Sequence, residues 1–150
     1  MTSASVEFLI NHVLIGLSRS FLQYVAESRP WVDETARKIE EQVKVLAARQ
    51  RQDVAELADL LIDREWAVDF GSFPTEYTNL HFISLSTLFD WLNHGQSVIA
   101  DSLTEAVTVL RESGDAAAVD RIEAIRHRQN DLAGALKELQ QELNRSAASA

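Results

Sequence analysis

The chain of 150 residues contains no cysteine, two prolines and five glycines. Without cysteine it has no disulfides, and zinc–thiolate sites and iron–sulfur clusters are excluded. Proline and glycine are the residues that most often interrupt helices, and hydrophobic residues make up 46% of the chain. The composition therefore favours long helices around a sizeable core, and the length fits a single domain over residues 1–150.

Positive charge and long apolar runs are also scarce. Fourteen basic residues stand against 23 acidic ones, for a net charge of −9. Because nucleic acids are bound by basic surfaces, we expect no nucleic-acid partner. The longest nearly apolar run, residues 13–25, contains Arg19 and Gln23 and is too short and polar for a membrane span. The first residues do not have the pattern of a signal peptide, so we expect no membrane association and a cytoplasmic location.

Apolar residues recur at helical spacing in four segments. The pattern predicts helices over about residues 6–27, 30–65, 82–112 and 116–144. Pro30 suits a helix start, Gly114 suits a helix end, and Asp115 suits the cap of the next helix. Because the first and third connections are so short, each should join antiparallel neighbours. The sequence thus predicts an all-α four-helix bundle.

Residues 66–80 have no helical period but hold the aromatic residues Phe70, Phe73 and Tyr77. Disordered linkers lack such residues, so we expect an ordered segment with these rings at least half buried against helices. About 15 extended residues reach roughly 50 Å, and a helix of about 30 residues is roughly 45 Å long. The segment is therefore predicted to cross over the whole bundle and to leave the second and third helices parallel.

Polar residues interrupt the apolar stripes of three helices. Gln50 and Asp53 interrupt the second stripe, Gln96 the third, and Arg126 with Gln129 the fourth. We expect these five residues to form an interior polar cluster, either a structural network or a polar ligand pocket. Because an unpaired buried charge is severely unfavourable, Asp53 and Arg126 are predicted to lie in contact or one water apart.

A second apolar set lies beside the stripe of the third helix and consists of Phe82, Phe89 and Trp91. One core contact does not need this much apolar surface. We therefore expect the crossover or a second copy of the chain to cover these rings, with a homodimer as the oligomer.

The pattern of four long helices with a long middle crossover resembles the ferritin-like superfamily over nearly the whole chain. Its metal-binding members carry Glu-x-x-His pairs on the second and fourth helices. At that spacing this chain has Gln50-x-x-Asp53 and Arg126-x-x-Gln129. Glutamine is a poor bridging ligand, and arginine places a positive charge where a cation would sit. The resemblance thus implies a degenerate ferritin-like bundle without the di-metal ligands.

Two functions follow as hypotheses. The first is a non-catalytic bundle without cofactor that acts through self-association or a protein partner. The second is a ferritin-like oxidoreductase or iron-handling protein that binds iron or manganese through an unconventional set, Glu7, His12 and Asp53. The sequence has no serine elbow, no glycine-rich phosphate loop and no closely spaced histidine pair, which favours the non-enzymatic hypothesis.

Overall fold

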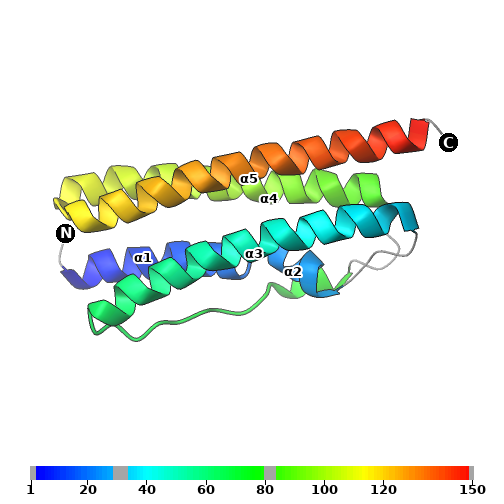
Figure 1. Cartoon of the computed structure of the whole chain (residues 1–150). Coiled ribbons are helices and arrows are strands. Elements are labelled where there is room, and N and C mark those ends of the chain that lie inside the picture. The colour runs from blue at the N-terminus through cyan, green and yellow to red at the C-terminus, as the bar shows by residue number, and fades with distance from the viewer. Residues whose placement is uncertain (1–2, 29–33, 80–83, 149–150) are drawn as a thin grey trace.

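A computed structural model shows an elongated all-α bundle and describes residues 3–28, 34–79 and 84–148 (Figure 1). Its helices are α1 (Ser3–Ser18), α2 (Phe21–Ser28), α3 (Glu34–Asp63), α4 (Leu85–Ser113) and α5 (Ala116–Ala148), with a short 3₁₀ helix η1 (Thr75–Asn79). The bundle has four long axes. Helices α1 and α2 together form the first, and α3, α4 and α5 form the other three.

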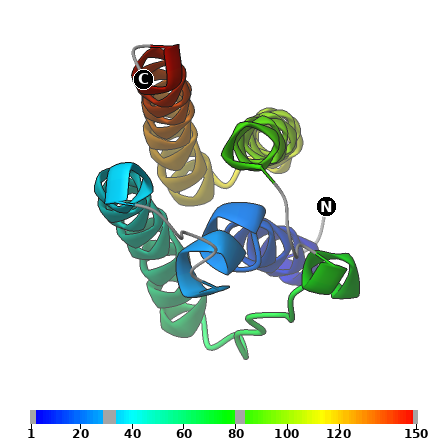
Figure 2. The same cartoon turned by 90° about the vertical axis from the view of Figure 1, so that its right-hand side faces the viewer.

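The chain direction confirms the predicted topology. In Figure 1, α3 and α4 both run from right to left, while α1 and α5 run the opposite way. The described part of the crossover, residues 64–79, returns along the length of the bundle between them. Seen down the axis in Figure 2, it passes below α3 and α1 before the chain reaches α4. The second and third long helices are therefore parallel.

The first predicted helix, residues 6–27, is interrupted in the structure. It forms α1 and α2, which are separated by Arg19 and Ser20. Ser20 lies just before α2, and its hydroxyl accepts a hydrogen bond from the Gln23 amide at 3.3 Å, as an N-cap does. A single helix was the wrong prediction because the apolar stripe continues unbroken across this cap. The interruption places Ser20 at the centre of the bundle.

Caps define the ends of the later helices. The side chain of Ser84 accepts from the Thr87 amide and starts α4, and Gly114 ends it in the left-handed conformation at φ 75°. Asp115 then caps α5, because its Oδ1 accepts from the Ala118 amide at 3.1 Å. The predicted junction at residues 114–115 is confirmed.

Aromatic contacts hold the crossover against α2. Phe73 packs edge-on against Tyr24, with centroids 5.4 Å apart, and Tyr77 packs edge-on against Phe21 at 5.2 Å. Both crossover rings are partly buried, whereas 46% of Phe70 remains exposed. Half burial is therefore confirmed for the set, with Phe70 close to the limit.

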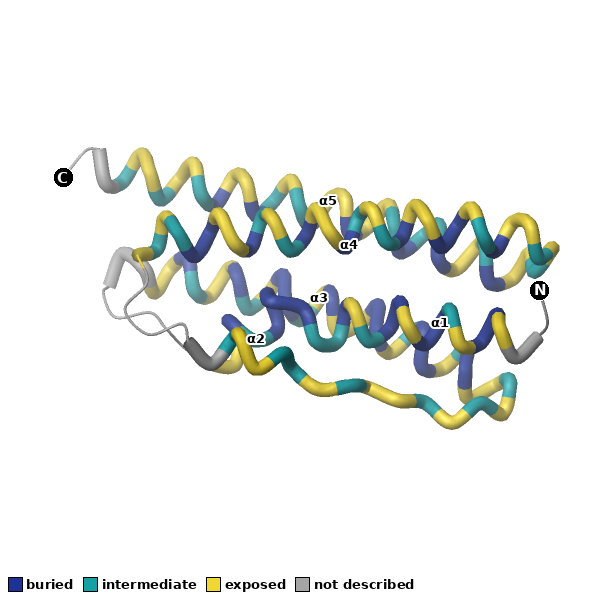
Figure 3. Tube along the Cα trace, turned by 180° about the vertical axis from the view of Figure 1, so that it is seen from behind, coloured by how far each residue is buried: buried dark blue, intermediate teal, exposed yellow. Residues whose placement is uncertain are grey.

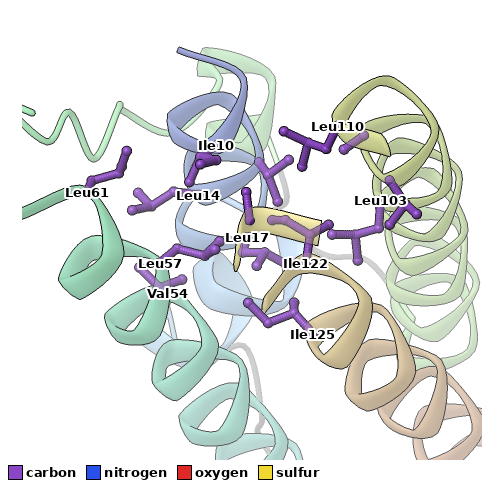
Figure 4. Close-up of a cluster of buried hydrophobic side chains, with 14 of the residues drawn as sticks. Ile10, Leu14, Leu17, Val54, Leu57, Leu61, Leu103, Leu110, Ile122 and Ile125 are labelled. Atoms are coloured by element: carbon purple, nitrogen blue, oxygen red, sulfur yellow. The ribbon is translucent and has the colours of Figure 1, made fainter. Parts of the chain in front are cut away.

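The core consists of two apolar clusters along the bundle axis, as the band of buried residues in Figure 3 follows the inner faces. One cluster joins α1 to the adjoining halves of α3, α4 and α5, and Figure 4 shows its side chains converging, among them Ile10, Leu14, Leu57, Leu103 and Ile122. The other joins α2 to the remaining halves and includes Val43, Leu92 and Leu136. Phe89 belongs to this second cluster.

One prediction about the surface rings needs correction, and the others stay predictions. Phe89 is fully buried between helices, so it is a core residue and not part of an apolar surface. Trp91 is 43% exposed and packs edge-on against Phe21 with centroids 6.0 Å apart. Phe82 lies outside the described residues. The stripe of α4 is thus wider than the sequence spacing suggested, because α2 covers part of its flank.

Candidate functional site: a glutamine network at the centre of the bundle

Three glutamines from three helices meet between the two apolar clusters. Gln50 of α3, Gln96 of α4 and Gln129 of α5 are all at most 3% exposed. Gln50 Nε2 donates to Oε1 of Gln96 and to Oε1 of Gln129, both at 3.0 Å. Gln96 Nε2 donates to the same Gln129 oxygen at 3.2 Å. The amides therefore form a closed triangle that links α3, α4 and α5.

The other side of Gln50 is bound to the interruption between α1 and α2. Its Oε1 accepts from Ser20 Oγ at 2.6 Å and from Gln23 Nε2 at 3.0 Å. Gln23 Nε2 also donates to the carbonyl of Ala47 at 2.8 Å, and its Oε1 accepts from Arg51 at 3.1 Å. The sequence reasoning missed Ser20 and Gln23. The only signal was that both are polar residues inside the nearly apolar run of residues 13–25.

Asp53 continues the network towards the seam between α3 and α5. Its Oδ2 accepts from Gln129 Nε2 at 2.8 Å, and its Oδ1 accepts from Arg128 Nε at 2.7 Å. Arg128 also donates to Glu56 at 2.6 Å, and Arg121 donates to the other Glu56 oxygen at 3.1 Å. A buried carboxylate is thus neutralised by a guanidinium at the mouth of the seam.

The predicted pair of Asp53 and Arg126 is wrong. Arg126 binds Glu123, one turn earlier on α5, and its guanidinium lowers the pKa of that carboxyl. The interior position between Ile122 and Gln129 is filled by Ile125, which is fully buried. Residues 122, 125 and 129 follow alternating spacings of three and four, so Arg126 is turned towards the edge of the helix.

Every buried side-chain nitrogen and oxygen of the network has a partner among the described residues. The buried atoms without one lie elsewhere, on Asn93 and Glu123. An amide network of this kind fixes the register of the helices because each shift of one turn breaks several hydrogen bonds. Its chemistry is that of a satisfied polar layer, with neither a free nucleophile nor a free base.

The residues of the proposed alternative metal set lie apart in separate contacts. Glu7 accepts from Arg64 at 3.2 Å, and His12 is exposed on α1. Arg64 also binds both oxygens of Asp115, at 2.6 and 3.0 Å, which raises the pKa of the arginine and lowers that of the aspartate. Within the described ranges, no three histidine or carboxylate side chains gather where they would hold a metal ion.

The ferritin-like arrangement implies a metal centre between the helices, and the central residues do not fit one. Divalent iron and manganese prefer carboxylate and imidazole ligands. Here three neutral amides already satisfy one another, and Asp53 is bound by Arg128 and Gln129. A cation would have to break these bonds and displace a guanidinium of its own sign.

Two hollows open on opposite seams of the bundle. One, of about 440 Å³, lies between α1, α4 and the crossover, and residues such as Val13, Gly16 and Gly95 line it. The other, of about 500 Å³, lies between α3 and α5 over Asp53 and Arg128. Tyr77 borders the first hollow, and burial raises the pKa of its phenol. Among the helices that the structure describes, none is long and apolar enough to cross a membrane.

Comparison with known proteins supports the fold and goes no further. No protein-family model matches the chain. No curated protein matches it in sequence. Among solved structures, a variant of the ferritin PmFTN, soaked overnight in iron, superposes with a TM-score of 0.75, covering 93% of this chain and 89% of its own at 11% identity. At that identity the likeness concerns the backbone alone. The chain therefore has the ferritin-like four-helix-bundle fold.

Proposed function

We propose that this protein is a non-catalytic ferritin-like bundle that acts by association, as a homodimer, without metal chemistry at its centre. The observation that carries the proposal is the glutamine network around Gln50. It occupies the interior between all four long helices with bonded neutral amides. Because these amides bind one another in the interior, we place the function of the protein on its surface.

The surface of the layer formed by α1, α3 and the crossover supports self-association. Phe8 of α1 is 70% exposed, Ile62 of α3 is 60% exposed, and Phe70 of the crossover is 46% exposed. The outward residues of α1 carry no charge, since its one charged residue, Glu7, is buried. In a chain of net charge −9, an uncharged helix face is where two copies approach with the least repulsion.

Sedimentation equilibrium of the purified protein tests the association. We expect a dimer, and we expect Phe8→Ser with Ile62→Ser to shift it to monomer, because both substitutions remove exposed apolar area. The control is Val45→Ser, which changes an apolar residue that is 52% exposed and lies on the side of α3 that faces α5. A monomeric wild-type protein, or a dimer that only the control disrupts, contradicts the proposal.

Metal analysis separates this proposal from the alternative, an iron or manganese protein. Protein produced in medium supplemented with both metals should contain neither in stoichiometric amount. Stoichiometric metal that is lost in Asp53→Asn would favour the alternative and its ligand set of Glu7, His12 and Asp53.

A further inference from the structure

The hollow between α1, α4 and the crossover has walls of an unusual kind for this protein. Its sides are mainly apolar, with Val13, Leu17, Val98 and Leu103 among the lining residues. Two glycines, Gly16 and Gly95, lie in the facing helices and leave the space open, because a Cβ at Gly16 would meet nothing within 4 Å. Its volume of about 440 Å³ is within the usual size range of small-molecule sites.

The hollow has no carboxylate among its described lining residues. The chain has 23 acidic residues and a net charge of −9, yet none of the described residues that line the hollow is an aspartate or a glutamate. His12, His94 and Arg19 line it instead. An apolar hollow whose one permanently charged lining residue is an arginine complements a ligand with an apolar body and an anionic group.

Arg19 is held in a way that suits anion binding. Its Nε donates to the carbonyls of Phe70 and Gly71, both at 3.1 Å, and its guanidinium stacks on the Phe73 ring at 4.9 Å from the centroid. Among the described residues nothing accepts from its two terminal nitrogens. A guanidinium fixed by its Nε and its face keeps the terminal N–H groups for a carboxylate, which accepts two parallel hydrogen bonds from them.

We propose that this hollow binds an apolar carboxylate, with the carboxylate on Arg19 and the hydrocarbon chain along the groove between Gly16 and Gly95. The hollow borders the central glutamine network at Ser20, and its lining does not include Phe8, Ile62 or Phe70 of the proposed dimer surface. It uses the interruption after α1, since Arg19 there reaches the crossover instead of continuing the helix.

Isothermal titration with decanoate below its micellar concentration tests the proposal. We expect one decanoate per chain, and at least about tenfold weaker binding to Arg19→Gln, as expected for the loss of a paired charge-assisted contact. Decanol and decyltrimethylammonium, which keep the chain but lack the anion, should bind as weakly as decanoate binds the variant.

Filling the groove gives a test that does not depend on the arginine, which also holds the crossover. Gly95→Leu should abolish decanoate binding, whereas the matched control Gly134→Leu, on an exposed part of α5 with no atom within 4 Å of a new Cβ, should leave it unchanged. Circular dichroism checks that each variant is folded. Amide shifts at Gly16 and Gly95 on adding decanoate should locate the ligand.

Three results would overturn the proposal: no binding of decanoate to the wild-type protein, equal binding of the cationic analogue, or equal loss of binding in Gly95→Leu and Gly134→Leu. The outcome is independent of the dimer, because sedimentation of the same samples reports association separately.

Discussion

The two hollows on opposite seams of this bundle are similar in size and differ in what fills their walls. On the α3–α5 seam, Asp53 and Glu56 of one helix bind Arg128 of the other, so the charges are satisfied within the protein. On the α1–α4 seam, the charged group is Arg19, whose terminal nitrogens face no described acceptor. One seam holds its own counter-charges, and the other leaves a positive group for a ligand.

The difference separates the parts of this bundle that hydrogen bonds and ion pairs hold together from the part that is left open. Its centre is closed by hydrogen bonds from Gln50, and the α3–α5 seam is closed by ion pairs over Asp53. On the α1–α4 seam, Gly16 and Gly95 face the hollow instead. We therefore expect substitutions on the bonded side to cost stability and substitutions on the open side to cost little.

The largest loss of stability is expected in the central glutamine network, which adjoins the α3–α5 seam. Gln50→Leu removes four hydrogen bonds and leaves Gln96 Oε1 without its donor. We expect the free energy of unfolding to fall by about 2–4 kcal/mol, measured by urea denaturation. The triple change to leucine at positions 50, 96 and 129 should cost much less than the sum of the single changes, since it removes donors and acceptors together. Additive losses would show that the amides act independently.

The next largest loss of stability is expected at the ion pair between Arg64 and Asp115, where α5 begins. Asp115→Ala removes the α5 cap and the bidentate partner of Arg64, at a cost of about 1–2 kcal/mol. The control Asp115→Asn keeps a capping oxygen and removes the charge.

The pH dependence of this control follows from the lowered pKa of Asp115. A lowered folded pKa means that the carboxylate stabilises the protein above the ordinary value of 3.8 and that this contribution is lost as pH falls through the folded pKa. The difference in unfolding free energy between wild type and Asp115→Asn should thus be constant at neutral pH and shrink in acid. A difference that grows below pH 3.8 would contradict the assignment.

On the charged seam itself, Arg128→Gln should cost about 1 kcal/mol, because the arginine side chain is half exposed and solvent screens its pairs with Asp53 and Glu56. The loss should diminish in high salt, as measured by urea denaturation at low and high sodium chloride. Arg126→Gln is the control, since the described partner of Arg126 is its own helix neighbour Glu123. If Arg126→Gln costs as much stability as Arg128→Gln, the Arg126 side chain lies in the interior of the bundle and the account is contradicted.

On the open seam we expect the smallest change, and of the opposite sign. Gly16→Ala should stabilise the protein by about 0.5–1 kcal/mol, because alanine is the better helix former and its Cβ meets no atom. Gly134→Ala in α5 should give the same gain. Thermal unfolding of both variants checks this, and a loss at Gly16 alone would mean that the seam is closer packed than its geometry shows.

The sequence was sufficient for the fold where one signal decided the outcome. The length of the crossover and its aromatic residues predicted that α3 and α4 are parallel, and Gly114 with Asp115 predicted the last junction. The burial of Gln50, Gln96 and Gln129 also followed from the apolar stripes around them. In each case the local pattern and the packing agree.

The sequence was insufficient where two spacings competed. From Ile122, a step of four leads to Arg126 and a step of three leads to Ile125, and packing selects the apolar side chain. This choice moves the partner of Asp53 from Arg126 to Arg128. The interruption at Ser20 was missed because a serine within an apolar run shows its capping role only when its partners, Gln23 and Gln50, are in place.

The most direct test of the central claim, that bonded amides and not metal ions hold the middle of this bundle, is manganese titration followed by thermal unfolding. A ligand that binds the folded state but not the unfolded state raises the melting temperature, and the rise grows with the logarithm of the ligand concentration above its Kd. Excess Mn²⁺ should leave the melting temperature of the wild-type protein unchanged, and likewise that of Asp53→Asn. A rise in the wild type that is absent in Asp53→Asn would contradict the claim and place a metal at Asp53.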